Sequence, residues 1–181
     1  MQDLRSLVAT FTMTGTVQAI VLRAARDVAA TEVEAVEAIA GRGLVGDHSA
    51  AHASTMPGAG KRQVTLIQQE HLPLIARWTH RETVAPVLLR RNLVVAGLNL
   101  LAARSPFPDQ AFVLRIGGDV VLQVTGDCAP CSKMETLLGP GGYNALRGHG
   151  GVTARVLEGG MLRVGDAVRV TTSGLSAREH R

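Results

Sequence analysis

The chain has 181 residues, a formal net charge of +4 and only 3% aromatic residues. A domain of this length buries a full core without disulfide bridges. Two cysteines in a chain without a recognisable signal peptide indicate a reducing compartment, so we expect a cytoplasmic protein. The basic residues are scattered arginines with few aromatic rings between them, which argues against nucleic-acid binding. Because no run of about 18 uncharged apolar residues occurs, we also expect no membrane span.

The chain divides into one domain and two flanking segments. Residues 1–13 are expected to be a disordered leader, with Met13 as a candidate start residue. The domain is assigned to residues 14–172, and residues 173–181 are expected to be a disordered tail. Within the domain, residues 47–61 show no periodicity, and an irregular loop of that length is usually functional or mobile.

Short β-branched runs bounded by glycine, proline or aspartate recur along the chain and predict a mainly β domain of α+β type. Two segments, residues 113–126 and residues 161–174, each have the pattern of a strand, a Gly-Asp turn and a strand. They predict two similar hairpins. The predicted strands cover residues 16–23, 62–68, 92–97, 112–118, 120–126, 152–160, 162–166 and 167–172.

Helical signals are fewer than strand signals. Residues 29–40 carry apolar side chains near helical spacing, which predicts a helix or, as the alternative, an acidic loop beside the first strand. Residues 69–78 are the stronger prediction, because Leu72, Ile75 and Trp78 fall on one face of a helix.

A third, short helix is predicted over residues 132–139. Ser132 is the expected N-cap and Glu135 would complete a capping box with it. Gly139 is expected to end the helix. This arrangement would place Cys131 immediately before a helix N-terminus.

The two cysteines lie three residues apart, and four roles were weighed for them. Zinc would need about four ligands, and a single C-x-x-C pair supplies two. A thioredoxin-like couple expects a βαβ unit, which the hairpin-rich pattern lacks. Two inert buried thiols, or one working thiolate with a bystander, remain open. A helix N-terminus and Lys133 favour the thiolate of Cys131, whereas Cys128 has Asp127 beside it.

The glycine-rich residues 139–151 follow the cysteines and contain Arg147 and His149. Glycines allow a backbone to approach a ligand and to direct N–H groups at an anion. A tightly packed loop with a solvated Arg147 is the alternative, because the run matches no phosphate-binding spacing.

Five segments together resemble one family. The chain is similar to a stand-alone MOSC domain, named after the C-terminal domain of molybdenum cofactor sulfurases, from about Thr16 to Val170. The segments are GLVGDH (43–48), KRQVTLIQQEHL (61–72), LRRNLVVAGLNL (89–100), LRIGGDVVLQVTGDCAPCSKME (114–135) and RGHGGVTARVLEGGMLRVGDAVRV (147–170).

The resemblance implies a MOSC-type, β-barrel-like domain with a few short helices and a cleft for the molybdenum cofactor, a molybdopterin. It implies that Cys131, after Pro130, is the metal ligand or the sulfur-handling residue. A thiolate suits such a molybdenum centre. The role of Cys128 stays open between bystander and resolving thiol.

The same resemblance implies further cofactor contacts. Arg90, Arg91 and Asn92 are expected to begin a strand, so only one arginine should face the cleft. Arg91 is expected to line the site with Asn92, since a guanidinium fork can hold a phosphate or an oxo group, and Arg90 is expected to be a surface charge. The remaining expected contacts are Asp47, His48, Lys133, Arg147 and His149.

Three functions follow as hypotheses. The first is a molybdenum-dependent oxidoreductase that reduces N-hydroxylated or other N–O substrates with electrons from a separate reductase. The second is a carrier that delivers sulfur, as a persulfide on Cys131, or cofactor to a molybdoenzyme. The third is a binding module for another small anion or nucleotide, in which the cysteines are structural.

Overall fold

The fold is built around a closed barrel. The computed structural model describes residues 3–51 and 60–173, and in that part of the chain seven strands close on themselves. All neighbouring pairs are antiparallel except the parallel pair β5–β6. The strands in barrel order are β1 (Gly15–Leu22), β11 (Ala167–Thr172), β7 (Phe112–Ile116), β8 (Val120–Asp127), β9 (Val152–Glu158), β5 (Val64–Gln68) and β6 (Leu93–Ala96). The expected barrel-like, mainly β domain is therefore confirmed.

Two smaller sheet elements flank the barrel. Strand β2 (Thr31–Val33) pairs with β1, and a separate sheet contains β10 (Gly160–Arg163), β3 (Ala35–Ile39) and β4 (Gly43–Leu44). The interior of the barrel is filled by aliphatic side chains such as Leu66, Leu93 and Leu122. These side chains alternate with outward-facing ones along each strand, which is the pattern that closes a small barrel around side chains.

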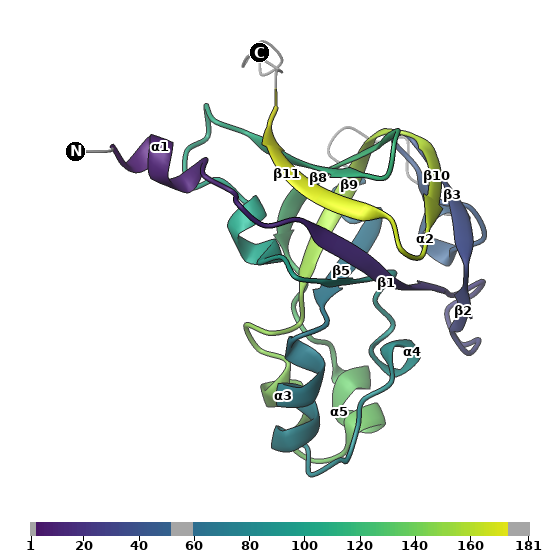
Figure 1. Cartoon of the computed structure of the whole chain (residues 1–181). Coiled ribbons are helices and arrows are strands. Elements are labelled where there is room, and N and C mark those ends of the chain that lie inside the picture. Colours follow the sequence, from purple (N-terminus) through teal and green to yellow (C-terminus); the bar gives the residue numbers. More distant parts are fainter. Residues whose placement is uncertain (1–2, 52–59, 174–181) are drawn as a thin grey trace.

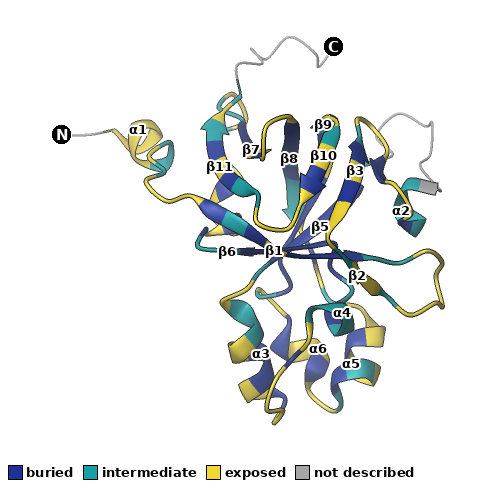
Figure 2. Cartoon of the chain, turned by 45° about the vertical axis from the view of Figure 1, so that its right-hand side comes forward, coloured by how far each residue is buried: buried dark blue, intermediate teal, exposed yellow. Residues whose placement is uncertain are grey.

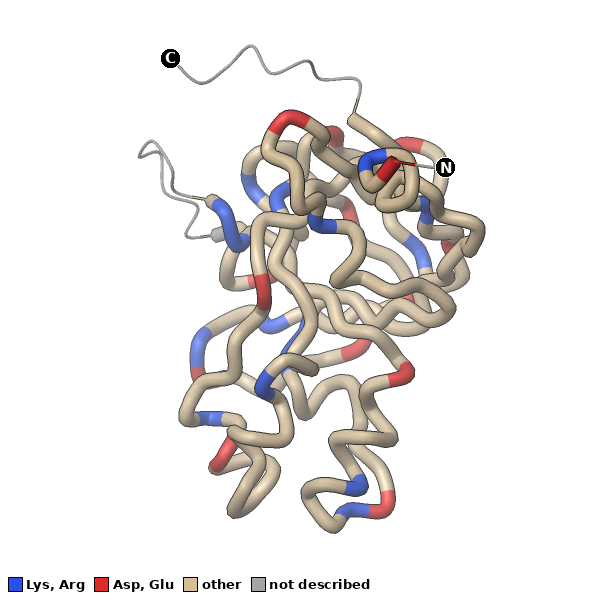
Figure 3. The backbone as a smooth tube through the Cα atoms, turned by 90° about the vertical axis from the view of Figure 1, so that its left-hand side faces the viewer, with Lys and Arg blue, Asp and Glu red and all other residues tan. Residues whose placement is uncertain are grey.

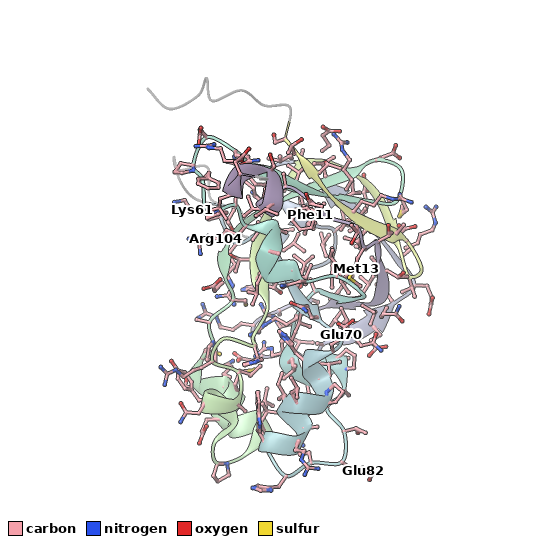
Figure 4. The ribbon with its side chains drawn as sticks, turned by 60° about the vertical axis from the view of Figure 1, so that its left-hand side comes forward. Phe11, Met13, Lys61, Glu70, Glu82 and Arg104 are labelled. Carbon is pink, nitrogen blue, oxygen red and sulfur yellow. The ribbon has the colours of Figure 1, made fainter. Side chains whose placement is uncertain are left out.

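A layer of helices lies against one end of the barrel (Figures 1 and 2). A second apolar cluster joins it to the strands, with Ile67 and Val94 from the barrel against Ile75, Met134 and Leu146 from the helices. Figure 4 labels Glu82 at the far tip of this layer and Glu70 at its junction with the barrel. The helices are α3 (His71–Trp78), α4 (Pro86–Leu89), α5 (Ser132–Leu138) and α6 (Gly142–Ala145).

Over the described ranges, three short helices lie outside this layer. They are α1 (Leu4–Val8), α2 (His48–Ala51) and the 3-10 helix η1 (Leu100–Ala103). The segment expected to be a disordered leader contains α1, and the ring of Phe11 packs edge-on against Phe112 at 5.5 Å between centroids. Residues 174–181 of the expected tail and residues 52–59 of the long loop lie outside the described residues.

The helix expected over residues 29–40 is wrong, because this segment forms β2 and β3. In β3, buried Val36 and Ala38 alternate with exposed neighbours, so the residues follow a period of two. The helix expected over residues 69–78 is confirmed as α3.

One of the two expected hairpins is confirmed. Strands β7 and β8 pair directly, with Leu114 opposite Leu122. The second is wrong, because β10 pairs with β3 whereas β11 pairs with β7 and β1. The turn at Asp166 bonds to β1 through Val17, which donates its N–H to the Asp166 carbonyl at 2.9 Å, so the chain changes sheet there.

Charged residues of both signs are spread over the barrel and the helical layer (Figure 3). Among the described residues, no helix combines the length and apolarity needed to cross a bilayer.

Candidate functional site

The two cysteines lie in the loop between β8 and α5 and differ in exposure. Cys128 is 1% exposed, and its N–H donates to the Gly151 carbonyl at 2.9 Å. Cys131 is exposed and is itself the N-cap of α5, in an extended conformation without a side-chain capping bond. Both thiols are free, and the expected position of Cys131 before a helix N-terminus is confirmed.

The details expected of this helix are partly wrong. Ser132 is its first residue rather than its cap, and Glu135 makes no capping box. The Glu135 carboxylate instead accepts the N–H groups of Gly141 and Tyr143, each at 2.8 Å, because the N-terminus of α6 lies beside it. These bonds lower the pKa of Glu135. Gly139 ends the helix as expected.

Lys133 points to an acidic partner on the surface. Its Nζ lies 2.9 Å from Asp27 Oδ1, and both side chains are largely exposed. The same ion pair lowers the pKa of Asp27 through the hydrogen bond and the charge of Lys133. Lys133 therefore joins α5 to the loop that follows β1.

Two arginines surround Cys128. Arg62 Nη2 donates to the Cys128 sulfur at 3.4 Å. Buried Arg91 donates from Nε to the Gly150 carbonyl at 2.7 Å and from Nη1 to the Leu89 carbonyl at 2.9 Å. The remaining nitrogen of Arg91, Nη2, is buried and has no hydrogen-bond partner among the described residues.

The environment of Arg91 connects the two sulfurs. Burial lowers the pKa of Arg91, and negative charge on Cys128 and on Cys131 acts in the opposite direction. The positive charge of Arg62 again lowers it. Both thiols are thus near enough to the Arg91 guanidinium to affect its pKa. The sequence next to Cys128, where Asp127 is the neighbour, gives no sign of this cationic group.

Arg90 is not a simple surface charge. The expected strand begins at Leu93 rather than at Arg90, which is the left-handed C-cap of α4 with φ of 57°. Because this residue breaks the alternation of a strand, Arg90 and Arg91 reach different parts of the site. Arg90 is half-buried, donates to the carbonyl of Arg26 at 2.6 Å and lines the pocket described next.

A small polar pocket of about 50 Å³ lies where β1, β5 and the end of α4 meet. Its basic lining consists of Arg23, Arg62 and Arg90. Arg23 Nε is buried without a partner among the described residues, and burial followed by the charge of Arg90 lowers the pKa of Arg23. Three guanidinium groups, one of them with a buried unsatisfied donor, form a site for an anion with several acceptor oxygens.

The polar wall of this pocket is formed by Asp47, Asn92 and Thr65. Asn92 accepts two bonds from Thr65 and donates to Asp47 Oδ2 at 3.0 Å and to the Val21 carbonyl at 3.2 Å. Asp47 also accepts the N–H groups of Arg23 and Ser49. The expected contacts Asp47 and Asn92 do reach the pocket, but their hydrogen bonds are to protein groups, so they fix its shape.

A larger cleft of about 670 Å³ adjoins the polar pocket and shares Ala30 and Arg90 with it. Its apolar part comes from α4, α5 and the loop after β1, with Val87, Leu88 and Leu137 as examples. A cleft of this size with a few charged groups at one end suits a small-molecule ligand.

Other expected contacts lie elsewhere. His48 begins α2 and donates its backbone N–H to the Arg23 carbonyl at 2.7 Å. His149 packs its ring on Trp78 and His71, with centroids at 4.8 Å and 5.0 Å. Arg147 is exposed and, with Arg104 (labelled in Figure 4), lines a different cleft of about 550 Å³ on the Cys128 loop.

The glycine-rich loop packs against protein rather than presenting an open cradle at its end. A side chain at Gly151 would meet the Leu66 carbonyl oxygen at 1.9 Å, and one at Gly150 would meet the Cys128 carbonyl oxygen at 2.4 Å. The tightly packed alternative is therefore correct for these two glycines. Their packing clamps the backbone of Cys128.

Two site residues, Arg23 and Arg62, were missed by sequence reasoning, and the contact of Arg62 with Cys128 was not anticipated. Arg62 stands in a segment that carries the family resemblance, which was the available signal. Arg23 directly follows β1, and nothing in its local sequence distinguishes it from the other arginines.

Comparison with known proteins gives a family match. The MOSC domain model matches residues 52–169, which is more than half of the chain. No curated protein matches the chain in sequence.

Solved structures share the fold at low sequence identity. The YuaD protein of Bacillus subtilis superposes with a TM-score of 0.74 at 16% identity, covering 91% of this chain and 100% of that one. YiiM of Geobacillus stearothermophilus gives 0.61 at 16% identity and covers 88% and 75%. YiiM of Escherichia coli gives 0.61 at 18% identity and covers 87% and 70%.

Proposed function

Because the chain belongs to the MOSC domain family, we propose that it binds the molybdenum cofactor and reduces N-hydroxylated or other N–O substrates. The observation that carries the proposal is the convergence of Arg23, Arg62 and Arg90 on one pocket beside the cysteine loop. The family association with this cofactor and the basic pocket point to the same class of ligand.

The residues fit an anionic, phosphate-bearing cofactor. The unpartnered Nε of Arg23 is a buried donor, and leaving such a group unsatisfied costs about 1–3 kcal/mol. Phosphate oxygens would satisfy it, with Arg62 and Arg90 as further donors. The adjoining cleft of about 670 Å³ has room for the ring system.

Cys131 is the proposed protein ligand of the metal. It is exposed, precedes the first turn of α5 and has no side-chain capping bond that would withdraw its sulfur. The described residues hold no group of three or more His, Cys, Asp or Glu side chains suited to a metal ion. A single cysteine therefore suits a metal that arrives with most of its ligands in a cofactor.

The chain's own groups would bind, orient and neutralise. Arg23, Arg62 and Arg90 would bind the negatively charged groups of the cofactor. The Asp47–Asn92 pair keeps the backbone of Arg23 and the start of β6 in place. When bound, the cofactor supplies the two-electron oxygen-transfer chemistry, with electrons from a separate reductase as the proposed partner.

A sulfur or cofactor carrier that serves a molybdoenzyme is the second candidate. The exposure of Cys131 favours it, because a persulfide must be reached by a partner. A sulfur adduct of about 32 mass units on Cys131 after incubation with a sulfur donor would support it. An unmodified thiol under conditions that load a known carrier would exclude it.

The proposal is tested by charge removal at the pocket. We would purify wild type, Arg23→Gln and Arg90→Gln from a host with intact cofactor synthesis, with Arg169→Gln as the exposed control on β11. Molybdenum and pterin should fall together in the two pocket variants and not in the control. Loaded wild type should then oxidise a reduced viologen when an N-hydroxylated base is added. Equal metal in all four proteins would contradict the proposal.

A further inference from the structure

Cys128 has no task in the proposed function, yet its surroundings are unusual for an inert buried thiol. Structural cysteines behave as small apolar side chains. Cys128 instead accepts a hydrogen bond from Arg62 at 3.4 Å and lies near the charged Arg91. A guanidinium in contact with the sulfur can stabilise the negative charge that develops there when the sulfur acts as a nucleophile.

The two thiols differ in solvent exposure and in how firmly their backbone is held. Cys131 is exposed, so a small oxidant reaches it first, whereas Cys128 is 1% exposed. The backbone of Cys128 is held by Gly151 and packed against Gly150. The Cys131 side chain has no capping bond to break, so the movement that brings the sulfurs together falls on Cys131.

The pair is close enough in the chain to join. Only Ala129 and Pro130 separate the cysteines. A disulfide needs the two Cα atoms within about 7 Å, so closure requires residues 128–131, which are irregular and have Cys131 extended, to fold into a turn.

We propose that Cys128 is the resolving thiol of an oxidation switch, in which a peroxide oxidises Cys131 and Cys128 then closes an internal disulfide. The effect of the switch on cofactor binding rests on the proposed function, because the disulfide would remove the Cys131 sulfur as a metal ligand. Closure itself does not depend on the cofactor.

The chemistry balances with hydrogen peroxide as the oxidant. The Cys131 sulfur attacks one peroxide oxygen, the O–O bond breaks, and a sulfenic acid and one water result. An electron pair on the Cys128 sulfur then forms the S–S bond, the S–O bond of Cys131 breaks, and hydroxide leaves and takes up a proton as the second water. Two thiols are oxidised to one disulfide, and one peroxide is reduced to two waters.

The experiment uses the full chain, fully reduced and free of cofactor, with one equivalent of hydrogen peroxide. Wild type should lose about two mass units and both titratable thiols, and a reductant should restore them. Cys128→Ser should instead stop with Cys131 as a sulfenic acid, trapped with dimedone and located by peptide fragmentation, and a second equivalent of peroxide should carry it on to sulfinic acid. Cys131→Ser should keep its buried thiol reduced over the same time.

Arg62→Gln tests the role of the cationic neighbour, with exposed Arg169→Gln as the matched control. Closure should slow about threefold or more in Arg62→Gln and keep the wild-type rate in the control. Circular dichroism of each variant would establish that folding is intact. Trapped sulfenic acid without disulfide in wild type, or equal rates in the two arginine variants, would overturn the proposal.

The two proposals fail separately. If the disulfide forms in a protein that never acquires molybdenum, the proposed cofactor binding is refuted and the proposed oxidation switch stands. If the protein binds molybdenum but its oxidised Cys131 forms no disulfide with Cys128, only the oxidation switch is refuted.

Discussion

Gly151 gives the sharpest test of how the loop is held. It has φ of +88°, and a side chain there would lie 1.9 Å from the Leu66 carbonyl oxygen on β5. In Gly151→Ala the left-handed conformation costs about 1–2 kcal/mol and the forced overlap adds about 1–3 kcal/mol. The sum is about 2–5 kcal/mol, and for a domain of this size each kcal/mol lowers the thermal midpoint by about 2–4 °C, so we expect a fall of roughly 4–20 °C.

Gly148→Ala is the matched control. Gly148 has φ of +75°, but none of the described residues lies within 4 Å of a side chain added there. This variant should therefore suffer only the conformational cost of about 1–2 kcal/mol. Thermal unfolding followed by circular dichroism compares the two.

Gly151→Ala should also expose the buried thiol. The Gly151 carbonyl accepts the N–H of Cys128 at 2.9 Å, so displacing the loop should speed alkylation of that thiol. Equal midpoints in Gly148→Ala and Gly151→Ala, with unchanged alkylation in both, would refute the account of a clamped loop.

Three further predictions concern charge. Burial lowers the pKa of His71 from its ordinary 6.5, so as the pH falls through that value the unfolded chain takes up the proton first and the free energy of unfolding declines. In urea titrations between about pH 7.5 and 5.5, His71→Asn should flatten this decline. The exposed control His80→Asn should leave the decline unchanged. Asn92→Asp would place a second carboxylate about 3 Å from the Asp47 carboxylate. Repulsion between the two buried charges should lower the free energy of unfolding by about 3 kcal/mol or more, as measured by urea unfolding. This destabilisation should be smaller at about pH 5, where one of the two carboxyl groups accepts a proton. Lys133→Ala should leave the thermal midpoint unchanged, because its ion partner is fully solvated; a clear fall would contradict the treatment of that pair as a surface contact.

The barrel could be predicted from sequence because its strands are short, β-branched and separated by clear turns. The failures lie where local patterns fit two structures. Val36 and Ile39 are three residues apart, as in a helix, yet Val36 and Ala38 face one side of a strand because β10 lies beside them. A Gly-Asp turn likewise indicates a change of direction, but not which sheet the next strand joins.

The site was predictable only in part. Cys131 could be identified from its place before a helix, because that signal is local. Arg62 and Cys128 are 66 positions apart, and only the barrel brings them into contact. The left-handed conformation of Arg90 is likewise set by how α4 meets β6, so its direction could not be read from strand alternation.

The most direct test of the central claim is the molybdenum and pterin content of wild type, Cys131→Ser and Cys128→Ser, purified reduced from a host that loads a control molybdoenzyme fully. The account predicts near-stoichiometric metal in wild type and Cys128→Ser and its loss in Cys131→Ser, with all three proteins folded. Absence of metal from wild type, or its retention in Cys131→Ser, would contradict the account.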